Sequence, residues 1–283
     1  MKTSVISYSL SEDPMRLSEW KEKLLSEIQS CVNSGADVIL FPELFLMGLA
    51  KYTDSKNPQE EITKTAELLE KDILPFIRKE VTTWVTIVLG SGPRNVNDRI
   101  FNSAPILHKG EWIFQDKLFL TPWETDFTPG NELFVFDVKG LKTCVVICFD
   151  SEQPDLAVKL KSEQVDYILV PSATTNKNGN QRVNRCASSR SVELGAVVIT
   201  SPLVGECGVD LVDHNEGRQG MFLPAQESMT DEQEQFSEYS SGKHIIQMYE
   251  FDERKILDLK NPSSETKPFL KEMNEGVKIS RLR

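Results

Sequence analysis

The sequence predicts an α/β protein in which helices cover the faces of a mixed β-sheet. Short β-branched apolar segments alternate with longer stretches whose apolar residues recur every three or four positions, the patterns of strands and amphipathic helices. Lys109-Gly110 and Lys139-Gly140 each join two short segments, as expected for β-hairpins. No linker or shift in composition divides residues 1–252. Strands and helices that alternate, with hairpins between them, favour a layered sandwich.

The first elements follow from their boundary residues. Residues 2–10 are a predicted strand, and Asp13 and Pro14 are typical of a helix start. Residues 38–41 are a short apolar strand expected to be buried on both faces, and Pro42 stops it. The helix between the two strands ends at Gly35 and has its apolar residues at helical spacing: Leu17, Trp20, Leu24, Ile28 and Cys31.

A second helix, a third strand and two hairpins complete the first half. Asp116, Lys117 and Leu118 directly follow the first hairpin, and residues 121–130 are a proline-containing loop. The helix is predicted from apolar residues at helical spacing: Ile62, Ala66, Leu69, Ile73 and Ile77. The third strand is predicted over 84–89. The two hairpins are predicted to pair 103–108 with 111–114 and 133–138 with 143–147.

The second half repeats the alternation of strands and helices. Pro154 marks the first turn of a helix, and a polar loop over 172–180 separates a strand that ends at Pro171 from the next helix. Residues 226–243 are polar and acidic and are expected to form a mobile excursion. The predicted segments are strand 167–170, helix 182–194, strand 196–200, and strands 221–223 and 244–251 as a last pair.

Composition excludes several functional classes. The 283 residues include 32 basic and 43 acidic side chains, a formal charge of −11 that gives no electrostatic case for nucleic acid or an anionic membrane. Five cysteines without a CxxC pair and three scattered histidines predict neither a disulfide framework nor a metal site. Residues 1–10 are too short and polar for a signal peptide, and no apolar run reaches membrane length. We therefore expect a cytoplasmic protein without a metal.

Cys148 lies where a β-branched apolar run, 143–147, stops and a helix is about to start. A helix N-terminus or a nearby cation favours the nucleophilic thiolate, and backbone N–H groups freed at such a turn can hold an oxyanion. The alternative is that Cys148 is a small buried apolar residue, which is the interpretation we give Cys144.

Glu43, Lys117 and Cys148 each follow the end of an apolar strand. Ligand sites of α/β sheets form outside the carboxyl ends of strands, so the three residues are expected to share one rim. A carboxylate, an ammonium and a thiol there supply a proton acceptor, a stabilising charge and a nucleophile. Taken singly, Glu43 is equally consistent with a cap and Lys117 with a solvated lysine.

Three segments in order, LFPELFLMGLA, DKLFLTPWE and CFDSEQPD, resemble the three signatures of the nitrilase or carbon–nitrogen hydrolase superfamily. The resemblance extends to about Asp252. It implies a four-layer α-β-β-α sandwich with mixed sheets over residues 1–252. It also implies a homodimer or larger homo-oligomer, with a tail over 253–283 that can pack across the interface, and it calls for no cofactor.

The resemblance also implies roles. Glu43 matches the general base, Lys117 the catalytic lysine and Cys148 the nucleophile. Glu124 matches a second glutamate that orients the substrate and the lysine, and the N–H of Phe149 matches an oxyanion donor.

Departures from the family pattern leave the triad intact and the substrate open. Gln153 and Asp155 replace the usual Phe and Glu, Phe119 and Leu120 stand where a histidine is common, and the loop 172–181 lacks an aromatic residue. Four loops are expected to determine the substrate specificity: 47–57, 121–130, 172–181 and 207–217. Their side chains offer an apolar wall (Trp123, Phe127, Leu211), partners for a carboxylate (Lys177, Arg182, Arg218) and partners for an amine (Glu124, Asp210).

The favoured hypothesis is hydrolysis of a non-peptide C–N bond in a small amide through a cysteine thioester. A nitrile would react at the same cysteine, so nitrilase activity stays open. A Cys–His enzyme would need His108 or His214 beside the cysteine. A non-catalytic binding module on the same fold is the remaining alternative.

Overall fold

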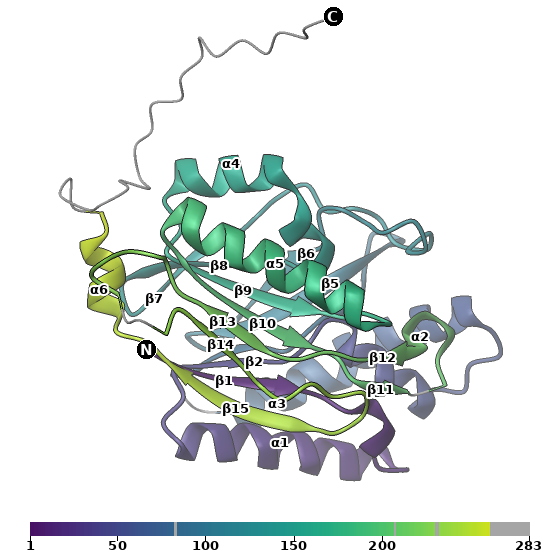
Figure 1. Cartoon of the computed structure of the whole chain (residues 1–283). Coiled ribbons are helices and arrows are strands. Elements are labelled where there is room, and N and C mark those ends of the chain that lie inside the picture. The colour runs from purple at the N-terminus through teal and green to yellow at the C-terminus, as the bar shows by residue number, and fades with distance from the viewer. Residues whose placement is uncertain (82–83, 207, 230–231, 261–283) are drawn as a thin grey trace, which may run out of the picture.

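The computed structural model describes residues 1–81, 84–206, 208–229 and 232–260. Two mixed β-sheets face each other and helices cover both outer faces, so the layers run α-β-β-α (Figure 1). Helices α4 (Pro154–Glu163) and α5 (Lys177–Leu194) lie over one sheet, and α1 (Leu17–Asn33) lies under the other. The four-layer sandwich implied by the resemblance is confirmed.

The first sheet contains the beginning and the end of the described chain. Its strands are β1 (Lys2–Ser7), β2 (Val38–Leu40), β3 (Thr86–Val88), β4 (Gly92–Val96), β5 (Arg99–His108), β6 (Glu111–Asp116) and β15 (Ile245–Glu250). Their order is β15-β1-β2-β3-β5-β4, with β6 paired to β5. Strands β1, β2 and β3 run parallel, and β15, β4 and β6 are antiparallel to their neighbours. The parallel strands therefore end on the same edge.

The second sheet is built from the middle of the chain. Its strands are β7 (Val135–Val138), β8 (Leu141–Val145), β9 (Tyr167–Ser172), β10 (Val197–Pro202), β13 (Gly220–Phe222) and β14 (Glu234–Phe236). Their order is β14-β13-β10-β9-β8-β7, with β8, β9 and β10 parallel. A separate pair consists of β11 (Gly205–Glu206) and β12 (His214–Asn215).

The remaining helices flank the two sheets. They are α2 (Pro58–Leu68), α3 (Leu74–Glu80) and α6 (Glu253–Asp258). A π-helical segment, Leu69–Ile73, joins α2 to α3, so the single helix predicted there is a helical run with a bulge. Pro75 lacks an N–H and cannot complete the α-helical hydrogen bond to residue 71, which accounts for the bulge.

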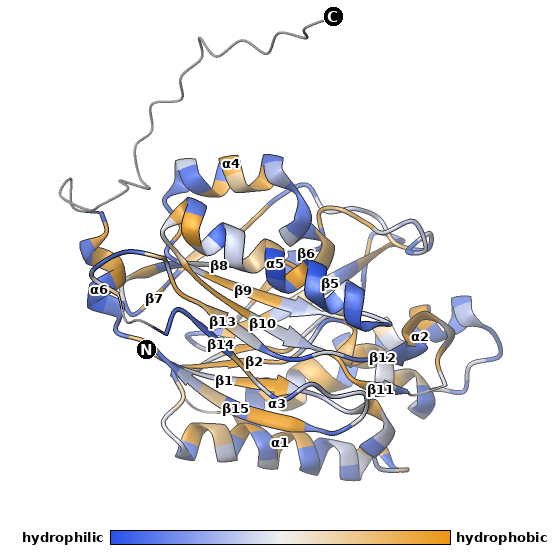
Figure 2. Ribbon diagram, in the orientation of Figure 1, coloured by the Kyte–Doolittle hydropathy of each residue, from blue (hydrophilic) through white to orange (hydrophobic). Residues whose placement is uncertain are grey.

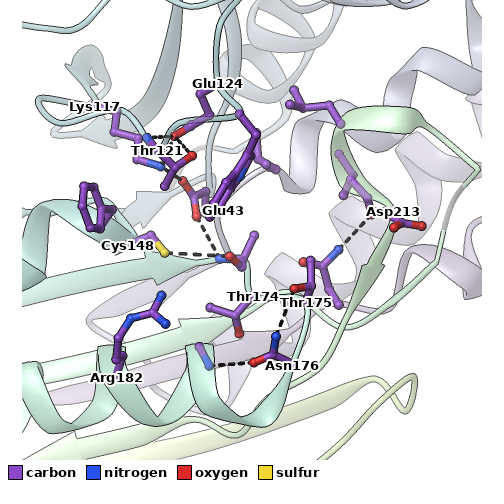
Figure 3. Close-up of a pocket in the computed structure, with 18 of the residues that line it drawn as sticks. Glu43, Lys117, Thr121, Glu124, Cys148, Thr174, Thr175, Asn176, Arg182 and Asp213 are labelled. Carbon is purple, nitrogen blue, oxygen red and sulfur yellow. Dashed lines mark hydrogen bonds and ion pairs between the residues drawn. The ribbon is translucent and has the colours of Figure 1, made fainter.

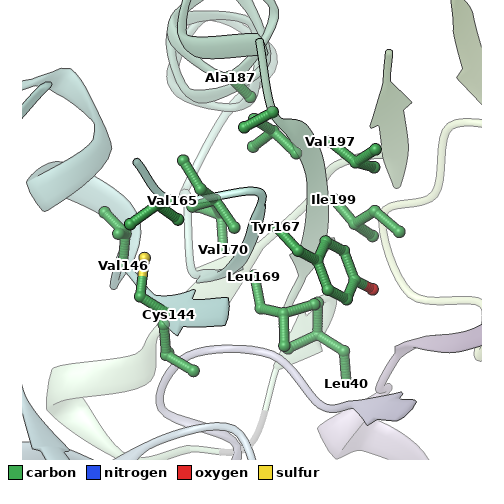
Figure 4. Close-up of a cluster of buried hydrophobic side chains, with 14 of the residues drawn as sticks. Leu40, Cys144, Val146, Val165, Tyr167, Leu169, Val170, Ala187, Val197 and Ile199 are labelled. Atoms are coloured by element: carbon green, nitrogen blue, oxygen red, sulfur yellow. The ribbon is translucent and has the colours of Figure 1, made fainter. Parts of the chain in front are cut away.

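The main core lies between the two sheets. Figure 4 shows Leu40 of β2 together with Leu169 of β9 and Ile199 of β10, all buried in one cluster. A second cluster packs Trp20, Leu24 and other apolar residues of α1 against the outer face of the first sheet. Hydrophobic colour accordingly follows the strands of both sheets (Figure 2). Among the described residues, no helix is both long and apolar enough to cross a bilayer.

Most predicted elements are confirmed, and both lysine–glycine turns are hairpins. Lys109 and Lys139 have positive φ angles of 51° and 52°, and the glycine after each is also left-handed, as a two-residue hairpin turn requires. A third such turn, Asn97-Asp98 with φ angles of 53° and 62°, joins β4 to β5. Strand β4 was not predicted from the sequence, although the Asn97-Asp98 pair was a usable signal for a hairpin.

Three predictions in the second half were wrong. Helix α5 begins at Lys177 rather than 182, because Asn176 caps it by accepting from the Gly179 N–H. Strands β13 and β15 do not pair, since β13 lies between β10 and β14 and β15 pairs with β1. The predicted excursion 226–243 contains β14 and is therefore partly a sheet strand.

The predicted tail begins with a short helix that packs on the sandwich. Ile256 of α6 is fully buried and belongs to the main hydrophobic cluster, and Asp252 caps the helix by accepting from the Arg254 N–H. Residues 261–283 lie outside the described part of the chain.

Gly90→Ala is expected to destabilise the fold more than Gly110→Ala. Both glycines have a positive φ, which costs a non-glycine residue about 1–2 kcal/mol. A Cβ at Gly110 would meet nothing within 4 Å, whereas a Cβ at Gly90 would lie 2.1 Å from the carbonyl oxygen of Pro42, so backbone must move. We expect free energies of unfolding lower by about 1–2 kcal/mol for Gly110→Ala and about 2–5 kcal/mol for Gly90→Ala in urea titrations. Equal losses would contradict the steric argument.

Candidate active site

Three strand ends place Glu43, Lys117 and Cys148 around one cavity. Glu43 follows β2 after Phe41 and Pro42, Lys117 comes directly after β6, and Cys148 follows β8 at the start of a 3₁₀ turn. All three line a cavity of about 440 Å³, and Figure 3 shows them turned toward one another. The structure therefore brings together the three residues that the sequence analysis singled out.

Lys117 lies between two glutamates. Its Nζ is 2.7 Å from Oε1 of Glu43 and 2.7 Å from Oε2 of Glu124. All three side chains are almost completely buried, at 2 % exposure each. A buried lysine is retained only with such partners, since several kcal/mol are needed to desolvate each ion.

This arrangement shifts the pKa of each of the three groups. Burial opposes the charge on Lys117, but Glu43, Cys148 and Glu124 together hold its pKa above the usual value, so it stays an ammonium. Burial also opposes the charge on Glu124, yet Lys117 and donors from Thr121 and Asn102 hold its pKa below the usual value. Burial raises the pKa of Glu43, and Lys117 offsets this only in part. Of the two carboxylates, Glu43 is therefore the better proton acceptor.

Glu124 is fixed by its own loop. Its Oε2 accepts hydrogen bonds from the backbone N–H of Thr121 at 2.8 Å and from the Thr121 hydroxyl at 2.7 Å. These donors, together with Lys117, leave this carboxylate ionised and oriented.

Cys148 has a strained backbone and a thiol whose pKa is raised. Its φ of 45° is left-handed, a conformation that costs a non-glycine residue about 1–3 kcal/mol and is often found at functional sites. Burial raises the pKa of the Cys148 thiol well above its ordinary value; the charge of Glu43 adds to the effect, and Lys117 offsets it in part. A hydrogen bond between the Cys148 and Glu43 side chains adds to the raised pKa of the thiol and partly offsets the raised pKa of Glu43. The resting thiol therefore needs a proton acceptor to become a nucleophile, and Glu43 is adjacent.

The peptide of Ala173 holds the acceptor and the thiol together. Oε2 of Glu43 accepts from the Ala173 N–H at 2.9 Å, and the Cys148 Sγ lies 3.8 Å from the Ala173 carbonyl oxygen. Ala173 follows β9, so β9 joins β8 as a second strand of the second sheet that ends at this cavity.

Asp150 connects the segment that follows Lys117 to the turn at Cys148 through hydrogen bonds. Its buried carboxylate accepts from the N–H of Leu118 at 3.1 Å, of Phe119 at 2.7 Å and of Ile147 at 3.3 Å. Leu118 and Phe119 follow Lys117, and Ile147 precedes Cys148. One side chain therefore fixes the spacing of two segments that are far apart in sequence. Phe149, in the first turn of this 3₁₀ helix, also lines the cavity.

Asn102 and Ser91 are site residues that the sequence analysis missed. Nδ2 of Asn102 lies 3.2 Å from Oε1 of Glu43 and 3.0 Å from Oε1 of Glu124, and Asn102 is fully buried. Ser91 Oγ donates to Oδ1 of Asn102 at 2.7 Å. The usable signal was the polar pair Asn102-Ser103 within the otherwise apolar segment 100–107.

The walls of the cavity differ in polarity. Trp123 and Leu211 form an apolar side, as expected, whereas Phe127 is buried elsewhere and does not line the cavity. Of the expected carboxylate partners, only Arg182 lines it, paired with Glu152 through Nε at 2.9 Å. The other two cations lie over aromatic rings outside the cavity, Lys177 on Tyr239 and Arg218 on Phe236; the side chain of Asp210 is outside the described part of the structure.

The two histidines considered for a Cys–His enzyme are engaged elsewhere. Nδ1 of His108 lies 2.9 Å from the Thr86 hydroxyl, and Nδ1 of His214 lies 3.1 Å from Glu206. Among the described residues that line the cavity with Cys148, neither histidine is present.

Comparison with known proteins identifies the family. Residues 7–234 match the family model for carbon-nitrogen hydrolase, which is most of the chain. The chain therefore belongs to the carbon–nitrogen hydrolase family, and the resemblance to the nitrilase superfamily is confirmed.

Individual relatives are distant. A probable hydrolase, YhcX, of Bacillus subtilis is 28% identical over 195 residues, which cover 67% of this chain and 38% of that protein. The chain thus spans well under half of that relative. An (R)-stereoselective amidase of a Pseudomonas species is 24% identical over 191 residues, 66% of each protein. The crystal structure of XC1258 from Xanthomonas campestris, described as a CN-hydrolase superfamily protein with an arsenic adduct in its active site, superposes with a TM-score of 0.70. It is 15% identical and covers 92% of this chain and 93% of that one, and it supports the fold.

Lys117→Met is expected to lower the free energy of unfolding by about 3–5 kcal/mol at pH 7, because it leaves two buried carboxylates without their cation. In the variant, burial and mutual repulsion raise the folded-state pKa values of both glutamates above their unfolded values. The folded variant then binds more protons than the unfolded chain, and its stability rises as pH falls. In wild type the opposite holds at Glu124. Its pKa is lowered in the folded state, so the stability that its ionised form contributes is lost as pH falls. The stability difference should therefore shrink between pH 7 and pH 4 in denaturant titrations.

The control for this prediction is Lys117→Met combined with Glu124→Gln. The double variant removes one carboxylate with the cation and should recover part of the lost stability at pH 7. A difference between wild type and Lys117→Met that stays constant from pH 7 to pH 4 would contradict the electrostatic explanation.

Proposed function

We propose that this protein hydrolyses a non-peptide C–N bond of a small amide through a thioester at Cys148, and releases ammonia or an amine. The observation that carries the proposal is the juxtaposition of a buried thiol, a buried ammonium and a carboxylate of raised pKa in one cavity. Membership of the carbon–nitrogen hydrolase family and the match to a stereoselective amidase support it.

In the first step, Glu43 takes the proton of the Cys148 thiol as the sulfur forms a bond to the amide carbon. The electron pair of the carbonyl π bond moves to oxygen. The ammonium of Lys117 and the N–H of Phe149 stabilise the resulting oxyanion, the lysine as a fixed charge and the N–H as a donor at the start of a helical turn.

The intermediate then collapses and is hydrolysed. The C–N bond breaks as the proton held by Glu43 moves to the leaving nitrogen, which departs as ammonia or an amine and leaves a thioester. Glu43 next takes a proton from water, whose oxygen attacks the thioester carbon. The C–S bond breaks, the carboxylic acid leaves, and the sulfur regains the proton from Glu43. No metal or cofactor enters this sequence.

A nitrile is the alternative substrate, since the same thiolate would add to it and form a thioimidate. The described cavity gives no feature that favours a nitrile. The match to an amidase favours the amide. We further propose that Trp123 and Leu211 contact the apolar part of the substrate.

Cys148→Ala is expected to reduce ammonia release from a panel of small amides by about 10⁴-fold or more, because the thioester cannot form. Ammonia release, measured with a coupled assay, should be little changed in Cys186→Ala, which removes a partly exposed thiol outside the cavity. Each amide should be tested beside the nitrile of the same carbon skeleton. Unchanged ammonia release in Cys148→Ala would remove the nucleophile assignment.

A second measurement addresses the intermediate directly. With Glu43→Gln, attack and hydrolysis both lose their proton acceptor, and mass spectrometry of the Cys148 peptide after long incubation should show an added acyl group. Alkylation of wild-type Cys148 no faster than that of a free thiol, together with no turnover, would instead favour a binding module.

A further inference from the structure

Glu43 and Glu124 carry like charges and share one cation. Both carboxylates bond to the same Nζ of Lys117, so the buried cluster holds two negative charges against one positive charge. Like charges this close repel, and one pKa is driven up unless other donors stabilise the ionised forms. Further donors are therefore needed, and two of them serve one carboxylate each: the Ala173 N–H bonds to Oε2 of Glu43, and Thr121 bonds to Oε2 of Glu124.

Asn102 is a donor to both carboxylates at once: it shares Oε1 of Glu43 with Lys117 and bonds to the Glu124 oxygen that Lys117 leaves free. Its two amide hydrogens are on one nitrogen, Nδ2, which lies 3.2 Å from Oε1 of Glu43 and 3.0 Å from Oε1 of Glu124. Asn102 is a residue of β5, the strand that pairs with β6. It therefore lies close to the backbone of Lys117, which directly follows β6. The backbone N–H of Lys117 also donates to the Asn102 carbonyl oxygen at 2.8 Å.

Ser91 decides which way the Asn102 amide points. The Leu44 N–H donates to Ser91 Oγ at 3.0 Å, so the hydroxyl proton is available for Oδ1 of Asn102, 2.7 Å away. With its oxygen held by Ser91, the amide can present only its nitrogen to the carboxylates. Ser91 and Asn102 are both fully buried, so water does not compete for these bonds.

The bonds form a closed ring that begins and ends at the segment of Glu43. The ring passes from the backbone of Leu44 to Ser91, then to Asn102, and from there to the side chain of Glu43. Leu44 has a left-handed φ of 56°, so the same ring also holds a strained residue beside the proposed base.

We propose that Asn102, oriented by Ser91, is a positioning residue that bridges Glu43 and Glu124 and keeps Glu43 ionised and aimed at the Cys148 thiol. This inference rests on the proposed role of Glu43 as proton acceptor. It adds two residues to the site that do not line the cavity and that act through the carboxylates.

The consequence is a pH dependence set by Asn102. A donor to an ionised carboxylate lowers its pKa, and loss of the donor raises it. The charged or titratable groups that act on Glu43 are Lys117, Glu124, Cys148 and Asp150. Asn102 is the neutral member of the cluster, so its replacement by a carboxylate changes the charge balance with little change in shape.

The test compares Asn102→Asp and Ser91→Ala with wild type, with Asn33→Asp, an exposed residue at the end of α1, as the matched control. For Asn102→Asp we expect the acid limb of the kcat/KM profile to move up by about one pH unit or more, because a third carboxylate raises the pKa of Glu43. At pH 7, kcat should fall by about 10- to 100-fold with KM within about threefold. Ser91→Ala should shift the limb in the same direction by less, and Asn33→Asp should not shift it.

A substrate-free readout keeps the test independent of the proposed function. The rate of Cys148 alkylation by iodoacetamide, followed by mass spectrometry from pH 5 to pH 9, should show the same upward shift in Asn102→Asp. If no amide is hydrolysed but this shift appears, the positioning role stands and the proposed function fails. If amides are hydrolysed but neither profile moves in Asn102→Asp or in Ser91→Ala, Asn102 is merely structural and the inference is overturned.

Discussion

The placement of one ammonium between two buried carboxylates is the constraint on which the site depends. Lys117 and Glu124 lie in one segment after β6, whereas Glu43 follows β2, and each is too costly to bury without the others. Their meeting requires β2 and β6 to end at the same edge, which the pairing of β2 with β3, β3 with β5 and β5 with β6 ensures. The sheet order is thus a precondition for the charge cluster.

Backbone strain on both sides of the cavity is held by buried hydrogen bonds. Leu44 and Cys148 are both left-handed, at a cost of about 1–3 kcal/mol each. Ser91 accepts from the Leu44 N–H, and Asp150 accepts from the N–H before Cys148 and from two N–H groups after Lys117. Because Asp150 joins the two segments, a shift of the cysteine turn would also displace the lysine. The proposed nucleophile and its cation therefore keep a fixed separation.

What the sequence predicted correctly were features with a local cause. Strand β2 and helix α1 follow from apolar periodicity, and the two lysine–glycine hairpins follow from their turn residues. The meeting of Glu43, Lys117 and Cys148 at one cavity was predicted because each follows an apolar strand and sits in a segment that resembles a family signature. Asn102 was missed because its partners lie 59 and 22 residues away, and nothing adjacent to it in the chain marks those contacts. The pairing of β15 with β1 is likewise set by closure of the sandwich around a shared core, which no local pattern encodes.

The proposed chemistry moves one negative charge around a cation that stays in place. When the Cys148 proton passes to Glu43, the charge leaves a carboxylate and appears on sulfur, and Lys117 interacts with both groups. When the sulfur attacks the substrate, the negative charge moves to the substrate oxygen. The ammonium of Lys117 is proposed to stabilise that oxygen as well. The net charge of the cavity is constant through these steps, so the buried surroundings need little reorganisation. A raised thiol pKa is then no obstacle, because the thiolate need exist only while Glu43 holds its proton.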